Sequence, residues 1–141
     1  MPALDAPARL LHRYRRRAEK EAEEPSRVRS IARRAAEKFR EHRPQLGAIR
    51  DDLPVLLRLA RAWGRGEYRQ VPWKSVVVLV AGLLYFLAPV DAIPDFIPVL
   101  GFVDDAAVLT YVLRTLKGDV RAFEEWEAGG ATPRALPPSG A

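Results

Sequence analysis

The sequence predicts an all-α protein, and three observations support this fold class. Apolar residues recur at helical spacing in two stretches, one that begins at Ser26 and one that follows Asp52. A third stretch is almost purely apolar, and no strand-length alternation of apolar and polar residues occurs anywhere in the sequence. We therefore expect a small helical protein with amphipathic helices and an apolar, membrane-associated helical hairpin, broken by a turn rich in proline and aspartate.

Charge is distributed unevenly along the 141 residues. Residues 1–74 carry 19 Lys and Arg against 10 Asp and Glu, whereas residues 75–141 carry 4 against 8. A basic first half is typical of a surface that binds anionic lipid headgroups or nucleic acid. The sequence has no cysteine, which excludes disulfides, thiolate zinc sites and cysteine nucleophiles.

The chain divides into three parts. Residues 1–25 are predicted to be a basic N-terminal helix or a frayed, solvated segment that Pro25 ends. Residues 26–128 form the helical domain, with a motif core at residues 70–118, and residues 129–141 are rich in Gly, Pro and Ala, which predicts a disordered tail. The first 30 residues have no apolar signal-peptide core, so we expect a cytoplasmic N-terminus.

Two amphipathic helices open the helical domain. The first has an apolar stripe and ends before Pro44. The second begins near Asp52, because Pro54 is tolerated in a first helical turn, and it closes at Gly64 and Gly66. Both stripes indicate helix–helix packing; they comprise Val28, Ile31, Ala32, Ala35 and Phe39, and then Leu46, Ile49, Leu53, Leu56, Leu57, Ala60 and Trp63.

The apolar segment from Val71 to Val90 has Lys74 as its only charge before the turn. From residue 72 it extends about 28 Å as a helix, close to the ~30 Å hydrocarbon core of a bilayer. Trp73 and Tyr85 suit the two membrane interfaces. The alternative is a core helix that the neighbouring amphipathic helices surround, and the sequence leaves both interpretations open.

The basic residues predict a topology. Residues 75–113 contain no Lys or Arg, and basic residues flank this stretch on both sides, so the positive-inside rule places both termini in the cytoplasm. A second full span would include Asp104 and Asp105, at a cost of about 2.5–3.5 kcal/mol each near the bilayer centre. The sequence leaves three topologies open: one span, a two-span hairpin and a re-entrant hairpin.

The turn after the apolar segment has a physical interpretation as a set of caps. Pro89 disfavours helix at Ala88, so the apolar helix is expected to end or kink there. Gly101 permits a left-handed turn, and aspartates accept bonds from backbone N–H groups at new helix starts. These structural residues are Pro89, Asp91, Pro94, Asp95, Pro98, Gly101, Asp104 and Asp105.

The sharper alternative for the same turn is a cation site, because Mg²⁺ and Ca²⁺ bind carboxylate oxygens. The candidate ligands are Asp91, Asp95, Asp104 and Asp105. Their spacing lacks the dense ligand pattern of an EF-hand loop, and three prolines stiffen the segment. The expectation is therefore caps, with no metal and no cofactor.

The stretch YFLAPVDAIPDFIPVLGFVDD, residues 85–105, resembles the motif of the YkvA-like family, a bacterial domain of unknown function also numbered DUF 1232. The resemblance covers residues 70–110, and Ala88 departs from it where the family has serine. It implies a small helical domain that is usually treated as membrane-embedded, that also occurs in the membrane region of a eukaryotic ubiquitin ligase, and that has no established catalysis.

No catalytic constellation is visible in the sequence, so we expect no enzyme. Gly64 and Gly66 lack the third glycine of a phosphate loop, and the acidic residues among the N-terminal arginines argue against nucleic acid. The favoured hypothesis is a structural or interaction protein of the bacterial inner membrane, integral or membrane-associated, whose arginine-rich half binds anionic lipid. A soluble helical-bundle adaptor or homo-oligomer is the alternative, and a membrane-bound metal-dependent enzyme is the third.

Overall fold

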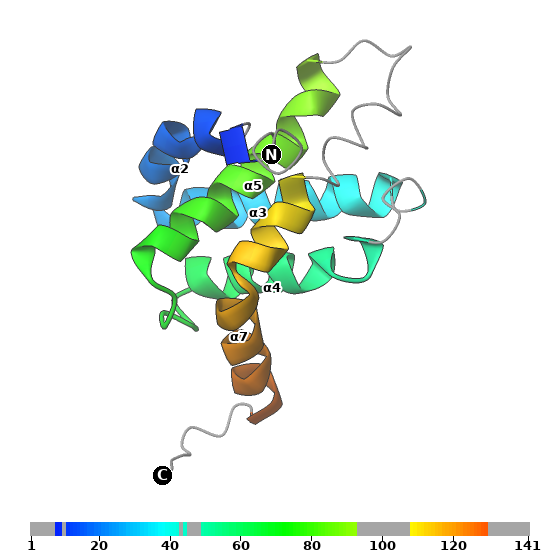
Figure 1. The fold of residues 1–141 in the computed structure, drawn as a ribbon. Helices are drawn as coiled ribbons and strands as arrows, with labels where there is room; N and C mark the ends of the chain where they lie inside the picture. Colours follow the sequence, from blue (N-terminus) through cyan, green and yellow to red (C-terminus); the bar gives the residue numbers. More distant parts are fainter. Residues whose placement is uncertain (1–7, 10, 43, 45–48, 93–107, 130–141) are drawn as a thin grey trace.

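The computed structural model describes residues 8–9, 11–42, 44, 49–92 and 108–129, and all regular structure among them is helical. The prediction of an all-α protein is confirmed. The helices are α2 (Arg15–Ala22), α3 (Pro25–His42), α4 (Leu53–Gly64), α5 (Trp73–Ala92) and α7 (Lys117–Gly129). Residues 11–13 and 108–115 are also helical, and Figure 1 shows the second of these segments in yellow, leading into α7.

Helix α2 and the residues before it pack onto α5 rather than projecting into solvent. Ala18 and Ala22 are buried, and so is Leu11. The Tyr14 ring lies edge-on to the Tyr85 ring, with centroids 5.6 Å apart. A helix with few apolar residues can still be held in place when its small residues let it approach a neighbour closely.

Helices α3 and α4 form the most extensive helix pair of the described residues. Pro25 is the first residue of α3, where its missing N–H has no helical partner to lose. Helix α4 follows Asp52 as predicted, with its proline in the first turn. The two helices approach each other closely at Gly64, whose carbonyl accepts a 2.7 Å hydrogen bond from Arg29 Nη1. A Cβ at this glycine would lie 2.6 Å from Arg29 Cγ, so the contact requires glycine.

Helix α5 is the central element of the bundle. It contacts α2, α3 and α4, and its side chains from Val76 to Phe86 are buried except for half-buried Val78. Residues 108–115 approach so closely that a Cβ at Gly82 would lie 2.8 Å from Val112 Cγ2. Across the described part of the chain, no helix combines the length and the apolarity needed to span a bilayer, so the expected transmembrane helix is not found there.

The C-terminal end of α5 differs from the sequence prediction. The helix continues through Ala88 and Pro89 to Ala92, so the structure excludes an end at Ala88. Packing of the preceding turns against α2 and α3 offsets the hydrogen bond that a proline removes from a helix. The expected turn that follows, residues 93–107, lies outside the described residues.

Helix α7 begins earlier than the sequence pattern predicts. Gly118 is typical of a helix end and Asp119 of an N-cap, which predicts a helix from residue 120, but α7 begins three residues earlier, at Lys117, and both residues lie in its first turn. Asp119 Oδ2 instead accepts a 2.6 Å hydrogen bond from Ser75 Oγ, which ties α7 to the start of α5. The predicted tail, apart from Gly129, lies outside the described residues.

Candidate functional site

Most residues of the predicted proline–aspartate turn lie outside the described residues: Pro94, Asp95, Pro98, Gly101, Asp104 and Asp105. Pro89 and Asp91 lie in the last turns of α5, where only the backbone is described. No group of three or more His, Asp or Glu side chains gathers within the described part of the chain. The cap and cation interpretations of the aspartates therefore both stay predictions.

A buried lysine lies close to this end of α5. Lys38 is only 6% exposed, and its Nζ donates a hydrogen bond to the backbone carbonyl of Phe86. The same Nζ lies 4.4 Å from the centroid of the Phe86 ring. A buried ammonium group needs such partners, because its transfer out of water is otherwise costly. Lys38 thus links α3 to α5 one turn before Pro89.

The contact of Lys38 lies close to a proline in α5. Pro89 has no N–H to donate to the carbonyl four residues earlier, which is that of Tyr85. The Lys38 ammonium donates from α3 to the next carbonyl, that of Phe86. Lys38 was not among the sites predicted from the sequence. A signal was present, because Lys38 follows Ile31 by seven residues and Ala35 by three, which places it on the apolar stripe of α3.

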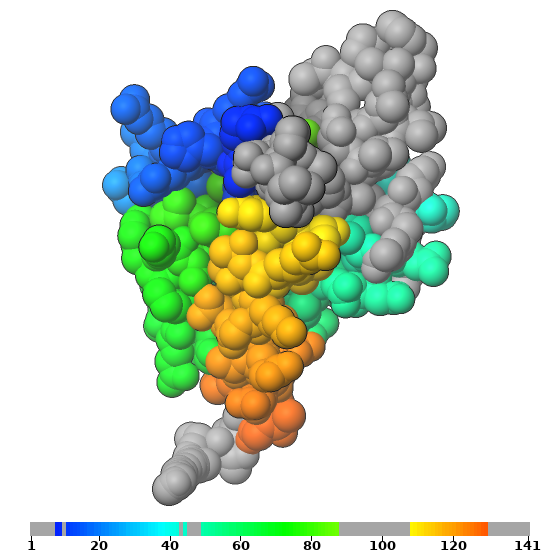
Figure 2. All heavy atoms as spheres, in the orientation of Figure 1, coloured from blue at the N-terminus to red at the C-terminus, as the bar shows by residue number. Residues whose placement is uncertain are grey.

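A groove of about 410 Å³ lies at the opposite end of α5. Three segments line it: the first helical segment (residues 8–9 and 11–22, which include α2), α5, and residues 108–115. Figure 2 shows them in blue, green and yellow, meeting on one face. Its apolar lining comprises Ala8, Leu11, Val77, Val78 and Ala81. Its aromatic and charged lining comprises His12, Arg15, Glu19, Trp73, Lys74 and Tyr111. The groove therefore combines an apolar floor with a polar, mostly basic rim.

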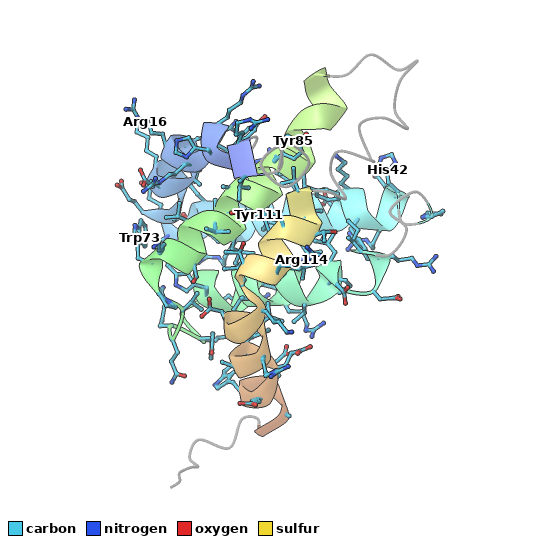
Figure 3. All side chains as sticks on the ribbon, in the orientation of Figure 1. Arg16, His42, Trp73, Tyr85, Tyr111 and Arg114 are labelled. Atoms are coloured by element: carbon cyan, nitrogen blue, oxygen red, sulfur yellow. The ribbon has the colours of Figure 1, made fainter. Side chains whose placement is uncertain are left out.

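The aromatic residue at the rim is unusually exposed. Trp73 is 47% exposed, the largest value among the large apolar side chains of the described residues. Figure 3 shows it projecting outward at the start of α5, with Tyr111 across the front of the helix. Lys74, the next residue, is also exposed. An exposed tryptophan beside a lysine suits a boundary between water and an apolar phase.

A basic hollow adjoins the groove on the outer side of the first helical segment. It shares His12, Arg15 and Glu19 with the groove and adds Arg13 and Arg16. Arg15 Nε lies 3.4 Å from Glu19 Oε2, and both side chains are largely solvated, so this ion pair is weak. Among its described lining residues, three arginines against one glutamate give the hollow a net positive charge.

The other side of the N-terminal end of α5 has a structural role. The Tyr68 ring packs 5.2 Å from Phe123 and 5.1 Å from Trp126, measured between ring centroids. Burial raises the pKa of Tyr68, and the negative charges of Asp119 and Glu125 raise it further. These contacts attach α7 to the bundle. Among the described residues that line the groove, Glu19 is the single acidic one.

A bidentate ion pair reinforces the attachment of α7 to the bundle. Arg58 Nε and Nη2 donate to the two carboxylate oxygens of Glu127 at 2.9 and 3.1 Å. The hydrogen bond to Glu127 raises the pKa of Arg58. Because α4 carries Arg58 and α7 carries Glu127, the pair joins these helices away from the groove.

Together these features define a small helical bundle with a buried apolar helix, a basic and aromatic groove, and no cluster of metal-binding side chains among the described residues. Comparison with known proteins places this bundle in a family. Residues 75–111 match the family described as "Protein of unknown function (DUF1232)". The chain is 36% identical over 74 residues to the "Uncharacterized membrane protein YkvA" of Bacillus subtilis (strain 168).

That alignment covers 52% of this chain and 70% of the Bacillus protein. The chain therefore belongs to the YkvA-like family, as the motif of residues 85–105 predicted. No solved structure matches it. The family match begins at Ser75 and ends at Tyr111, so it includes most of α5 and reaches one wall of the groove.

Proposed function

We propose that this protein is a membrane-associated helical interaction module that attaches to anionic lipid surfaces and catalyses no reaction. The observation that carries the proposal is the exposed Trp73 beside Lys74, next to the basic hollow of the first helical segment. Tryptophan is favoured at the headgroup level of a bilayer, and lysine binds anionic headgroups from there. The Bacillus relative, named as a membrane protein, supports the same localisation.

The charge of the first helical segment supports attachment to an anionic surface. Residues 11–20 carry five Lys and Arg against the single acidic residue Glu19, and all five basic side chains are exposed. Each basic residue close to such a surface contributes about 1 kcal/mol. We place this surface on the cytoplasmic leaflet of the bacterial inner membrane, with both termini cytoplasmic, since that leaflet attracts basic segments.

The packing of α5 favours attachment through the surface of the bundle. The apolar side chains of this helix from Val76 to Phe86 contact protein on several sides, so lipid is not needed to cover them in this arrangement. The basic hollow and Trp73 are instead available to solvent. This distinguishes the proposal from the hairpin that the sequence pattern favoured.

Sedimentation with lipid vesicles tests the proposal. We expect the purified protein to pellet with vesicles that mix phosphatidylcholine and phosphatidylglycerol, and to stay in solution with phosphatidylcholine alone. High salt should weaken the interaction, because it screens exposed charges. Trp73→Ala should reduce pelleting, because it removes the interfacial ring.

Trp126 provides the matched control. It is the other exposed large apolar residue of the described part, at 37%, but it stacks on Phe123 and its neighbours Glu125 and Glu127 are acidic. Trp126→Ala should leave vesicle binding unchanged. Equal losses in the two variants, or equal binding to both vesicle types, would contradict the proposal.

Fractionation of expressing cells separates the surface mode from its alternatives. Alkaline carbonate should release a protein held by charge and one ring, whereas a protein that needs detergent has apolar side chains in the bilayer. A protein found entirely in the detergent-free supernatant, and not pelleted by vesicles, would be the helical-bundle adaptor or oligomer with α5 as its core. That second candidate is favoured by the burial of α5. Capture of nucleic acid in place of lipid would also overturn the proposal.

A further inference from the structure

We propose that the groove between the first helical segment and α5 binds one molecule of an anionic glycerophospholipid taken from the bilayer. This inference rests on the proposed membrane attachment and adds a specific ligand site to it. Attachment by charge alone needs only exposed basic residues, whereas this site needs a shaped apolar cavity beside them. The groove of about 410 Å³ supplies that cavity, within the ~300–1,000 Å³ typical of small-molecule sites.

The floor of the groove suits an acyl chain. Val77, Val78 and Ala81 of α5 line it, with Leu11 from the first helical segment opposite. Val77 and Ala81 are buried, and Val78 is half-buried. None of these side chains carries a polar group, so the floor offers nothing to a hydrophilic ligand, while an acyl chain placed there would leave water.

The rim suits an anionic headgroup. Lys74 and Arg15 line the groove together, and Arg15 also belongs to the adjoining basic hollow. Glu19 is the acidic side chain that both share, and its 3.4 Å ion pair with Arg15 is exposed. A phosphate group competes well for such an arginine, because guanidinium and phosphate form paired hydrogen bonds.

The combination selects the ligand class. A soluble phosphate compound would use the rim and leave the apolar floor empty, and a neutral lipid would fill the floor without using the positive charges. An anionic phospholipid matches both parts at once. Trp73 lines the groove and is 47% exposed, and an amphipathic indole ring suits the glycerol backbone, between the apolar chain and the charged group.

A short-chain lipid below its micelle concentration tests the site without a bilayer. In isothermal titration calorimetry, dihexanoyl phosphatidylglycerol should bind the full chain with one molecule per protein. Dihexanoyl phosphatidylcholine should bind about tenfold more weakly, because its headgroup is neutral overall.

Two matched pairs of variants divide the site into its parts. Val78→Trp fills the floor and should weaken binding at least about tenfold, whereas Val120→Trp, at a half-buried valine of α7 outside the groove, should not. The double variant Arg15→Gln/Lys74→Gln should also lose about tenfold, whereas Arg33→Gln/Arg34→Gln, at exposed positions of α3, changes the net charge equally and should retain affinity. Circular dichroism checks folding, and the surface variants test the site even if the floor variant fails to fold.

The outcomes separate this inference from the proposed function. Vesicle pelleting without binding of the short-chain lipid would overturn the groove site and leave membrane attachment standing. Binding of the short-chain lipid without vesicle pelleting would overturn membrane attachment and leave the groove site standing. Equal losses within either matched pair would overturn the site, and so would octanoate binding more tightly than the phospholipid.

Discussion

At each end of helix α5 a lysine lies beside an aromatic residue, yet the two pairs differ in their exposure to solvent and in the groups that they contact. At the N-terminal end, Trp73 and Lys74 are exposed and border a groove. At the C-terminal end, Phe86 is fully buried and Lys38 of α3 is 6% exposed. The residue types are similar, and the surroundings decide what each pair does.

The difference follows from what covers each end. The C-terminal half of α5 lies against α3, whose stripe brings Lys38 onto the Phe86 carbonyl and ring. A buried charge with fixed partners holds two helices in register but is closed to ligands. At the other end, α7 contacts α5 through the hydrogen bond between Ser75 and Asp119, and Trp73 and Lys74 are exposed. One end is therefore suited to stability and the other to binding.

The two aromatic residues give the largest predicted contrast. Phe86→Ala should lower the free energy of unfolding by about 3–5 kcal/mol, because it leaves a cavity in the core. Trp73→Ala should lower it by less than about 1 kcal/mol, because much of the ring already contacts water. Urea unfolding followed by far-ultraviolet circular dichroism measures both. Similar losses would mean that Trp73 is covered in solution.

The two lysines give the next contrast. Lys38→Met keeps most of the apolar stem but removes the donor to the Phe86 carbonyl, which should cost about 1–3 kcal/mol. Lys74→Met at the exposed end should change stability by less than about 0.5 kcal/mol. The same urea titrations compare them. A more stable Lys38→Met variant would show that desolvation of the ammonium outweighs its contacts, as happens at some buried charges.

Most of the fold could be predicted from the sequence, because helical spacing and proline positions mark α3, α4 and α5. The groove could not, because it depends on how the first helical segment packs on α5. That segment has so few apolar residues that solvation was expected, yet Leu11, Ala18 and Ala22 are buried and Tyr14 contacts Tyr85. The end of α5 was misjudged for a related reason, since tertiary packing carries the helix through Pro89. The motif predicted the family, but its turn lies outside the described residues.

Two glycine-to-alanine substitutions test the packing against α5 between its two ends. Gly82→Ala places a methyl group 2.8 Å from Val112 Cγ2 and should cost about 1–3 kcal/mol, only partly offset by the higher helix propensity of alanine. Gly118→Ala in α7 meets no atom within 4 Å and should stabilise by about 0.5–1 kcal/mol. Thermal melts show whether each substitution raises or lowers the stability of the protein. A stabilising Gly82→Ala would mean that residues 108–115 lie farther from α5 than the structure places them.

The smallest predicted effect on stability concerns Tyr68, which packs against α7 near the start of α5, and it emerges only at alkaline pH. Burial and the nearby charges of Asp119 and Glu125 raise the pKa of Tyr68 above the value of about 10 for an unfolded chain. The folded protein then keeps a proton that the unfolded chain has lost, so the contribution of Tyr68 to stability is complete below about pH 10 and disappears as the pH rises through the folded pKa. Tyr68→Phe cannot ionise, and its stability should therefore fall less steeply in the alkaline range than that of the wild type. Urea midpoints from neutral to alkaline pH measure the two slopes, and ultraviolet titration of the tyrosines follows ionisation directly. Identical slopes would show that Tyr68 reaches solvent and that its contacts with Phe123 and Trp126 are not maintained in solution.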